Sequence, residues 1–474
     1  MPVMPNDFHL LDSPHSFKEL IFLAKSQENN DNIVSISYNI NPIDPLVFLS
    51  VMKEENQRYF YWENQRKQEA IIAIGDLKSL QVNSDYYNEN VQDINRFQQC
   101  QNFVKNTLNK ITFLQDSFKS NNSYFFSYFT FLNQQNYHNK SFPLATIFLP
   151  YIQLLKKRDT YTLTVNTYNN YHYIKEIKKY IAQNFSEKIT LNYKLQTEKE
   201  NNLNYNLEEK QYQSFIDKVN QGLEAIREKK LTKIVVAHAL EVKTNKNFNV
   251  IKSLENLRHN YPDCYIFAVS NQNEEHFIGA SPERLLSIKN NHIISDALAG
   301  SAPRGKNKED DQKIGENLLN SEKEKREHQI VSDFIFEQLS TMNLHPKKAP
   351  LQLLKLSNIQ HLWTPISAKI INSINAFEII NKLHPTPAMA GEPIKIACDK
   401  IESSENFDRS LYAAPIGWLN SEGNCEFIVG IRSALVKGNS ARLYAGAGIV
   451  AGSKPDQELT EIKLKFQALL QALK

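Results

Sequence analysis

The chain has 474 residues, of which 23% are charged and 41% are hydrophobic. This length and composition indicate a globular protein with a sizeable core, in two or three domains or in one large layered domain. The formal net charge is only +3, and this balance gives no case for nucleic-acid binding, which requires a clustered basic face.

Cysteines and apolar segments narrow the class of protein further. The four cysteines lie far apart and form no Cys-x-x-Cys pair, so neither a zinc knuckle nor a disulfide framework is indicated. The N-terminus lacks a basic region followed by an apolar core, and the most apolar segment, residues 142–155, is short and contains two prolines. We therefore expect a cytoplasmic protein without a membrane span.

Residues 1–205 are rich in Asn, Gln, Tyr and Phe and contain no recognisable catalytic constellation. Strand-like pieces recur at residues 33–38, 46–52 and 160–165. Asn-rich composition can be typical of disorder, but the regular supply of aromatic and β-branched residues predicts an ordered sheet region. The polar segment 197–210 is typical of a linker or excursion between two halves.

From residue 211 onward, the apolar residues are spaced more regularly. Apolar residues three or four apart predict a helix over 212–226, a long helix over 308–339 and a final helix from residue 455. The predicted strands are 233–242, 264–270, 276–279, 284–288, 292–297, 426–436 and 441–450. Consecutive strands with short connections, and helices that are grouped instead of alternating, indicate an α+β fold with mostly antiparallel sheets.

Two of these helices carry a Glu-x-x-Glu pattern. Glu324 and Glu327 extend the apolar stripe of the long helix, and Glu458 and Glu461 adjoin the apolar face of the final helix. Because an unpaired buried carboxylate is costly, these groups need a proton, a cation or a metal, and their hard oxygens suit Mg²⁺. Alternatively, both helix faces are solvated, and Glu461 forms an ordinary i,i+4 ion pair with Lys465.

Several single residues are also candidates for chemistry. Lys233 opens an apolar strand, where burial would lower its pKa and suit a general base, whereas a lysine at a strand edge would extend into solvent. Glu283 follows a proline and precedes two leucines, so it is either a protonated acid in an apolar site or a turn glutamate. Arg432 lies in a strand among Val, Ile and Ala and needs a carboxylate from the protein or a ligand. His361 and His384, taken singly, are interpreted as structural.

The segment 444–452, YAGAGIVAG, matches the glycine spacing of a dinucleotide-binding fold between a strand and a helix. Too few residues follow Gly452 for a second strand with a ribose-binding acid, so the oxidoreductase interpretation fails. We expect this turn and the turn at 297–305, ALAGSAPRG, to bring backbone N–H groups near anionic oxygens.

In this order, the motifs resemble those of the chorismate-utilising enzyme family, and most closely those of isochorismate synthases. The matching segments cover residues 211–474 and are KIVVAHAL, IGASPERLL, DALAGSAPRG, SEKEKREHQIV, HLWTPI, HPTPAMAGEP, FDRSLYAAPIGW, EFIVGIRSAL, RLYAGAGIV and ELTEIKLK. The resemblance implies an α+β fold like that of anthranilate synthase component I. It also implies a variable N-terminal part over 1–205 and a chorismate-binding catalytic region over 206–474.

The resemblance further implies an Mg²⁺-dependent conversion of chorismate to isochorismate, in which water adds at ring C2 and the C4 hydroxyl leaves. By the family pattern, Lys233 is the base and Glu283 the acid. Glu327 and Glu461 would hold Mg²⁺, supported by Glu324 and Glu458. The remaining positions that the pattern places against the substrate are Gly300, Ser301, His361, Ala388, Tyr412, Arg432, Gly446 and Lys465.

Family members differ in their products. Enzymes that make aminodeoxychorismate have a nucleophilic lysine at the position of Ala299, and anthranilate synthases lack the counterpart of Lys233 and use ammonia from a glutaminase. We therefore expect neither reaction, no glutaminase subunit, and a monomer. Salicylate synthases, which tend to have Thr at the position of Ala388, are the nearest enzymatic alternative. A catalytically inactive chorismate-binding relative is the alternative from another class. Isochorismate could feed menaquinone or siderophore biosynthesis, and the sequence favours neither.

Overall fold

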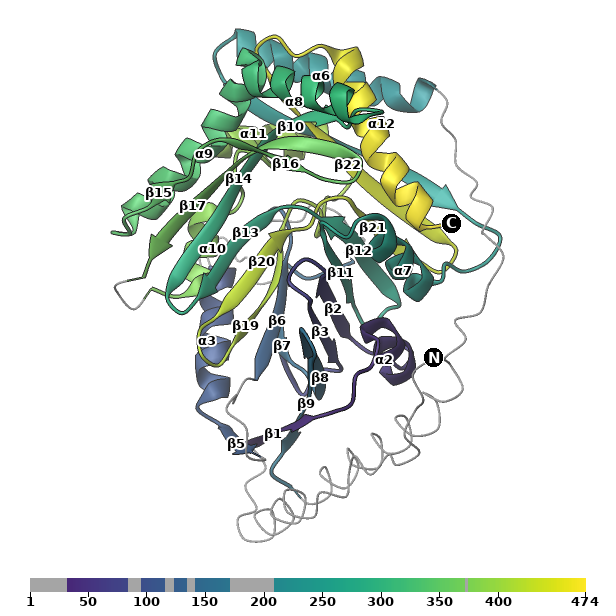
Figure 1. Ribbon diagram of the computed structural model, residues 1–474, viewed down its shortest axis with the longest axis vertical. Helices are drawn as coiled ribbons and strands as arrows, with labels where there is room; N and C mark the ends of the chain where they lie inside the picture. The colour runs from purple at the N-terminus through teal and green to yellow at the C-terminus, as the bar shows by residue number, and fades with distance from the viewer. Residues whose placement is uncertain (1–31, 84–94, 116–122, 134–140, 171–208, 371–373) are drawn as a thin grey trace.

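The computed structural model describes residues 32–83, 95–115, 123–133, 141–170, 209–370 and 374–474. These residues form two large β-sheets with helices around them (Figure 1). The predicted α+β class is confirmed. Of the segment 197–210, predicted to be a linker, residues 197–208 lie outside the described residues, and residues 209–210 begin a helix.

The first sheet, sheet A, has twelve strands within the described residues. In spatial order they are β18 (Gly391–Glu392), β10 (Lys233–Lys243), β22 (Ser440–Val450), β21 (Ser433–Lys437), β12 (Glu275–Ser281), β11 (Tyr265–Ser270), β2 (Tyr59–Asn64), β3 (Glu69–Ile74), β8 (Ile152–Lys157), β9 (Thr160–Tyr168), β1 (Ile33–Asn39) and β5 (Ile111–Gln115). Neighbouring strands are antiparallel, as predicted, except that β1 and β5 are parallel.

The second sheet, sheet B, has ten strands within the described residues. In spatial order they are β15 (Lys347–Lys348), β17 (Ile359–Lys369), β14 (His292–Pro303), β13 (Arg284–Lys289), β20 (Cys425–Val429), β19 (Pro415–Asn420), β6 (Tyr124–Phe129), β7 (Ala145–Leu149) and β4 (Lys78–Val82), with β16 (Gln352–Lys355) also paired to β17. All of these pairs are antiparallel.

The two sheets pack face to face, and the core lies between them. The rings of Phe60 on β2 and Phe126 on β6 have centroids 4.9 Å apart, and the Tyr265 hydroxyl on β11 donates to Glu426 Oε1 on β20 over 2.7 Å. Both halves of the chain contribute to both sheets, because β2 pairs with β11 and β6 pairs with β19. The N-terminal half is therefore part of the same layered body as the C-terminal half.

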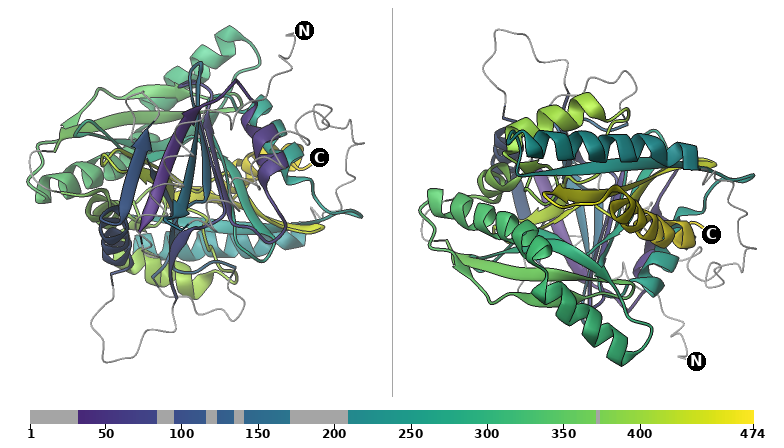
Figure 2. Two further views of the ribbon diagram at one scale, coloured as in Figure 1. Left: turned by 90° about the horizontal axis from the view of Figure 1, so that it is seen from below. Right: turned by 90° about the horizontal axis from the view of Figure 1, so that it is seen from above.

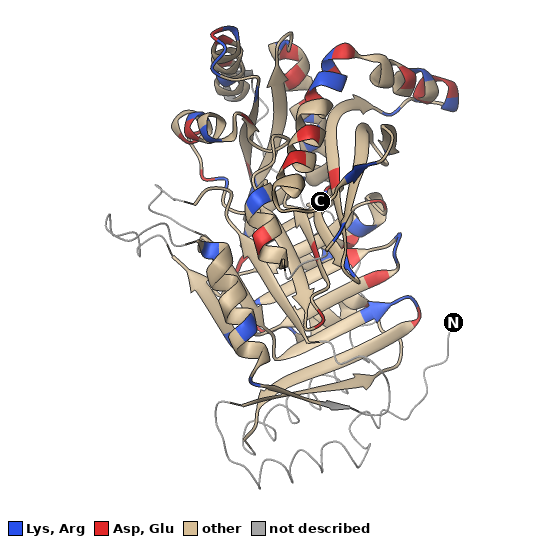
Figure 3. Ribbon diagram, turned by 90° about the vertical axis from the view of Figure 1, so that its left-hand side faces the viewer, with Lys and Arg blue, Asp and Glu red and all other residues tan. Residues whose placement is uncertain are grey.

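Helices cover the outer faces. They are α2 (Pro45–Met52), α3 (Arg96–Leu108), α6 (Glu209–Arg227), α7 (Val250–Asn260), α8 (Lys308–Asn320), α9 (Glu322–Thr341), α10 (Ala376–Leu383), α11 (Ile394–Ser404) and α12 (Pro455–Ala472). Contacts place α6 and α12 on sheet A, and α8 and α9 on sheet B. Seen from above in Figure 2, α6, α9 and α12 lie across one end of the molecule. In Figure 3, blue and red residues are interspersed along the helices in the upper part of the molecule, and the lower strands are mostly tan.

The chain crosses from one sheet to the other at two points that matter for function. β12 in sheet A is followed by β13 in sheet B, and the connection consists of Pro282 and Glu283. β20 in sheet B is followed by β21 in sheet A, and this connection ends with Arg432. Residues in such connections turn away from regular strand pairing, so their side chains are available to line a cavity between the sheets.

Three sequence predictions of local structure are wrong. Residues 46–52 form helix α2 instead of a strand, because Asp44 caps the helix by accepting from Leu46 N–H (2.8 Å) and Pro45 occupies its first turn. The long helix divides into α8 and α9 at Ser321, whose side chain accepts from Glu324 N–H.

The third wrong prediction is the single strand over 426–436. It is two strands in different sheets, broken where Arg432 adopts a left-handed backbone with φ of 49°. Within the described part of the chain, every helix is too short or too polar to cross a membrane.

Candidate active site

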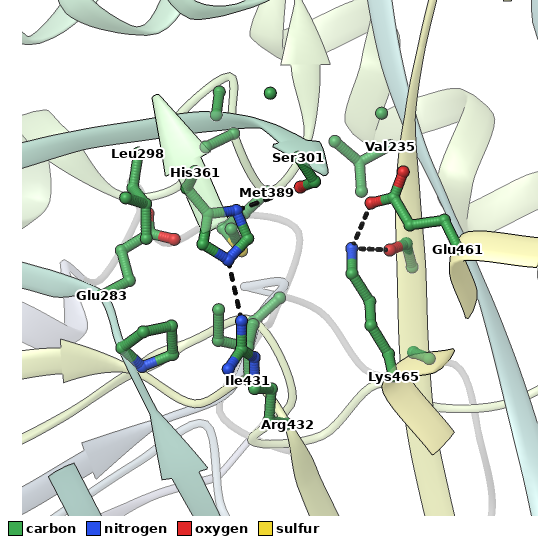
Figure 4. A pocket seen from close by; sticks show the side chains of 18 of the residues that line it. Val235, Glu283, Leu298, Ser301, His361, Met389, Ile431, Arg432, Glu461 and Lys465 are labelled. Carbon is green, nitrogen blue, oxygen red and sulfur yellow. Dashed lines mark hydrogen bonds and ion pairs between the residues drawn. The ribbon is translucent and has the colours of Figure 1, made fainter. Parts of the chain in front are cut away.

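A pocket lies where the two crossovers meet α9 and α12 (Figure 4). Eleven of the residues predicted from the sequence line it: Glu283, Gly300, Ser301, Glu327, His361, Ala388, Tyr412, Arg432, Gly446, Glu461 and Lys465. Of the other three, Lys233 contacts Glu327 and Glu324 contacts Ser301. Glu458 pairs with Lys323, which is not a lining residue. The residues predicted from the sequence thus come together from six strands and helices and four connections.

Glu283 lies in the connection between β12 and β13 and is only 2% exposed. Its backbone N–H donates to Ser281 Oγ (3.2 Å), and its C=O accepts from Val429 N–H (3.1 Å), which fixes the connection against β20. Burial, assisted by the negative charge of Asp296, raises the pKa of the Glu283 carboxyl to about 8. The ionic partner of Arg284 is Asp296 (2.9 Å). Glu283 is therefore protonated near neutral pH and can act as a proton donor.

Lys233 is completely buried at the start of β10, so it does not extend into solvent as an edge lysine would. Its Nζ lies 3.0 Å from Glu327 Oε1, and it has no hydrogen-bond acceptor among the described residues, because this ion pair lacks hydrogen-bond geometry. The lysine pairs with Glu327 and not with Glu283. Its amine is thus held beside the pocket with hydrogen-bonding capacity unused.

The four glutamates of the two Glu-x-x-Glu patterns are arranged in two layers. Glu327 and Glu461 line the pocket. Behind them, Glu324 Oε2 accepts from Ser301 N–H (3.3 Å), and Glu458 pairs with Lys323 (2.9 Å). Burial, followed by the charge of Glu327, raises the pKa of Glu324. A cation bound between these carboxylates would relieve that repulsion.

Two glycines make room for the carboxylates of α9. A Cβ atom at Gly448 would lie 2.1 Å from Glu327 Oε1, and one at Gly300 would lie 3.2 Å from Glu324 Oε2. Gly300 also has φ of 77°, which favours glycine. The role of Gly448 was not predicted from the sequence, although the alternation of Gly446 and Gly448 along β22 places both on one face of the strand.

The donor set fits Mg²⁺ by its chemistry. Within the described residues, no three carboxylate, imidazole or thiol side chains converge as a ready-made ligand cluster. Mg²⁺ does not need such a cluster, since it is usually held by one or two carboxylates and completes its shell with water and substrate oxygens. Glu327 and Glu461 provide those two carboxylates on pocket walls.

Two cations face the same cavity from different elements. Lys465 lies 2.7 Å from Glu461 and donates to the Gly446 carbonyl over 2.7 Å, and the ion pair is the i,i+4 contact predicted from the sequence. Arg432 is 7% exposed, and its Nη1 has no hydrogen-bond partner among the described residues. A buried guanidinium nitrogen without an acceptor is costly, so a carboxylate of a ligand is its natural partner.

His361 serves as an acceptor beside Arg432. Arg432 Nη2 can only donate, so His361 Nε2 accepts over 2.8 Å and the ring proton is on Nδ1, from which it donates to Ser301 Oγ over 3.0 Å. Burial and the charge of Arg432 lower the pKa of His361 well below its usual value, which keeps the ring neutral. His384, by contrast, bonds to the Phe131 carbonyl (3.0 Å) and is not part of the lining.

The remaining wall is apolar. Tyr412 stacks on Tyr444 with ring centroids 5.2 Å apart, and its hydroxyl is the first atom that a Cβ at Gly446 would meet, at 2.9 Å. Ala388 and Met389 come from the turn before β18. Figure 4 shows Glu283 and Leu298 on one side of the cavity and Val235, Glu461 and Lys465 on the other. A flat ligand between these walls would face an acid on one side and charged groups on the other.

Comparisons with known proteins identify the family. The family model described as "Chorismate binding enzyme" matches residues 17–474, which extends the match well into the N-terminal half. Isochorismate synthase MenF of Bacillus subtilis (strain 168) is 31% identical over 464 residues, covering 95% of this chain and 96% of that protein.

Two solved structures share the fold. The menaquinone-specific isochorismate synthase MenF from Escherichia coli has a TM-score of 0.77 at 24% identity, covering 97% of this chain and 99% of that chain. Anthranilate synthase component I from Streptococcus pneumoniae has a TM-score of 0.66 at 17% identity, covering 85% of this chain and 92% of that chain. The family model and the nearly full-length relative show that the protein belongs to the chorismate-binding enzyme family.

Proposed function

We propose that this protein is an isochorismate synthase, which converts chorismate to isochorismate by adding water at ring C2 and expelling the C4 hydroxyl. One observation carries the proposal. The pocket is lined by a buried, protonated acid, Glu283, and beside the pocket lies a buried lysine, Lys233, which pairs with Glu327 and not with Glu283. The nearly full-length relative named isochorismate synthase supports the same reaction.

The pocket provides separate partners for the two carboxylates of chorismate. Arg432 and Lys465 can donate charge-assisted hydrogen bonds to one of them. The Nη1 of Arg432, which has no partner among the described residues, is the donor most in need of an acceptor. The neutral His361 orients Arg432 without adding charge. Glu327 and Glu461 would hold Mg²⁺, with Glu324 and Glu458 behind them. When bound, the ion would offset the charge of the other carboxylate and fix its position.

The proposed proton transfers use Lys233 and Glu283. Lys233 accepts a proton from water as the water oxygen bonds to ring C2. The Glu283 carboxyl gives its proton to the C4 oxygen, which leaves as water while the ring double bonds shift. Water is consumed and released in equal amounts, so the reaction is an isomerisation. Afterwards the lysine loses its proton to solvent and the carboxylate regains one.

The test compares two lysines on the same strand. Lys233→Ala should abolish most turnover of chorismate, whereas Lys243→Ala, at the exposed far end of β10, should leave it unchanged. Product would be separated by chromatography after reaction in oxygen-18 water with Mg²⁺, and one labelled oxygen is expected in isochorismate. Unlabelled isochorismate, or a kcat of Lys233→Ala near that of wild type, would rule out this mechanism.

Two further properties are proposed on the same basis. Because water is the nucleophile, the isolated chain should be fully active without a glutaminase subunit, and added ammonium should yield no amino product. The composition supports a cytoplasmic location, which fractionation of the cells would test.

A further inference from the structure

Arg409 is a buried residue outside the pocket that connects several of its walls. It lies between α11 and β19 and is only 4% exposed. Its Nε donates to Glu405 Oε2 (2.7 Å) and its Nη2 to Glu405 Oε1 (2.5 Å). Nη1 also donates to the Met389 carbonyl (3.0 Å), and Nη2 donates to the Val235 carbonyl (2.9 Å). One planar guanidinium therefore binds a carboxylate and two separate main-chain segments.

Both main-chain segments line the pocket. Val235 is two residues beyond Lys233 on β10, and Met389 follows Ala388 in the turn that covers the cavity. β18 pairs with Lys233 and Ile234, and Val235 N–H donates to the Ala390 carbonyl just before β18 (2.8 Å), so main-chain pairing on this side of β10 ends at Val235. There, the Arg409 and Glu405 side chains take over as partners, since Glu405 Oε1 also accepts from Ala237 N–H (3.0 Å). The ion pair thus acts as a substitute for a neighbouring strand.

The same arginine connects the pocket to the N-terminal half of the chain. Its guanidinium carbon lies 4.4 Å from the centre of the Phe131 ring. Phe131 N–H donates to the Ser410 carbonyl (2.8 Å), and the Phe131 carbonyl bonds His384 (3.0 Å). Arg409 is therefore held by two sets of contacts: those with Phe131, which follows β6, and those with Glu405.

We propose that Arg409 is a positioning residue for catalysis, which sets the spacing between the strand that carries Lys233 and the turn at Ala388 and Met389. This inference rests on the proposed function. Arg432 and Lys465, the proposed carboxylate-binding residues, come from other elements, whereas Arg409 adjoins the lining residue Tyr412, whose ring centre lies 5.8 Å from the guanidinium carbon. Loosening the guanidinium contacts should therefore displace the base relative to the ring and lower kcat, while substrate binding and KM change little.

The variant of choice is Arg409→Lys. Lysine keeps a cation beside Glu405, but one ammonium cannot reach both carboxylate oxygens and both carbonyls as a guanidinium fork does. A second variant, Glu405→Leu with Arg409→Met, removes both charges together and avoids leaving an unpaired buried carboxylate. The matched control is Arg58→Lys, because Arg58 is also buried (2% exposed) and paired with a carboxylate, Asp76 (2.7 Å), but lies away from the pocket.

Two measurements test the proposal. In the turnover assay, Arg409→Lys and the double variant should lose about 10- to 100-fold in kcat with KM within about threefold of wild type, and Arg58→Lys should keep the wild-type kcat. In hydrogen exchange, which needs no substrate, the Ala237 amide should exchange at least about tenfold faster in both Arg409 variants and not in Arg58→Lys.

A kcat within twofold of wild type in both folded Arg409 variants would overturn the inference, as would unchanged exchange at Ala237 or an equal kcat loss in Arg58→Lys. These outcomes differ from failure of the proposed function, in which the wild-type protein itself would make no isochorismate. Faster exchange confined to the Arg409 variants would in that case still support the positioning role.

Discussion

Replacing Glu283 by Gln should inactivate the protein and stabilise it at the same time. The substitution keeps the size of the side chain and removes its ability to ionise. Glu283 is the only group asked to protonate the leaving C4 oxygen, so kcat should fall by roughly 10²- to 10⁴-fold. The gain in stability follows from the cost of holding a carboxyl protonated in a fully buried site at neutral pH.

The magnitude of this gain can be worked from the raised pKa. The carboxyl has a usual pKa of 4.5 and a folded-state pKa of about 8. A group whose pKa is raised by folding contributes its full stability below the unfolded value and loses it as pH rises through the folded value. The folded wild-type protein is therefore penalised by roughly 1 kcal/mol at pH 5, about 3 kcal/mol at pH 7 and about 4 kcal/mol at pH 8.

Denaturant unfolding at several pH values measures this directly. The difference in unfolding free energy between Glu283→Gln and wild type should grow from pH 5 to pH 8, because every other titrating group is common to both proteins. Glu322→Gln is the matched control, since that side chain is 82% exposed, and its curve should run parallel to wild type. A constant difference between Glu283→Gln and wild type across this range would refute a protonated Glu283, and with it the acid role.

Four further results are expected. For wild type, kcat/KM should fall as pH rises through about 8, where Glu283 loses its proton, and a flat profile through pH 9 would contradict this assignment. Glu327→Gln or Glu461→Gln should raise the Mg²⁺ concentration for half-maximal activity roughly tenfold or more, and an unchanged Mg²⁺ dependence in both would remove the metal site from these helices. Arg432→Ala and Lys465→Ala should raise KM about 10- to 100-fold as each loses a charge-assisted hydrogen bond, whereas a loss in kcat alone would argue against carboxylate binding. The pocket is lined by Ala388, where salicylate synthases tend to have Thr, so isochorismate should be the main product. Stoichiometric pyruvate would reassign the protein as a salicylate synthase.

Much of the C-terminal half could be predicted from local patterns. The apolar periodicity of α6 and α12 and the apolar runs of β10 and β22 depend on neighbours in sequence, and the structure has these elements within a few residues of the expected bounds. The wrong predictions occur where tertiary packing determines the secondary structure. Seven of the eight residues of α2 are buried, so an apolar run without helical periodicity still forms a helix once Asp44 and Pro45 start it.

The candidate site was predictable as a set of residues and not as a set of contacts. Motif resemblance named the groups that line the pocket, and the family assignment is confirmed. It could not reveal that Lys233 pairs with Glu327, because that contact depends on how α9 packs against β22. Arg409 escaped notice for a similar reason, since its role depends on main-chain carbonyls whose direction no residue pattern encodes.

The sharing of both sheets by the two halves limits how the protein can be trimmed or recombined. Every proposed catalytic group lies after residue 209, yet this part alone would leave β11 and β19 with unpaired edges, because their partners β2 and β6 would be gone. Such open edges invite pairing between molecules and aggregation. A chimera that exchanges the N-terminal half must therefore reproduce two strand registers, Tyr265 opposite Asn64 and Leu419 opposite Phe125, before any active-site residue can matter.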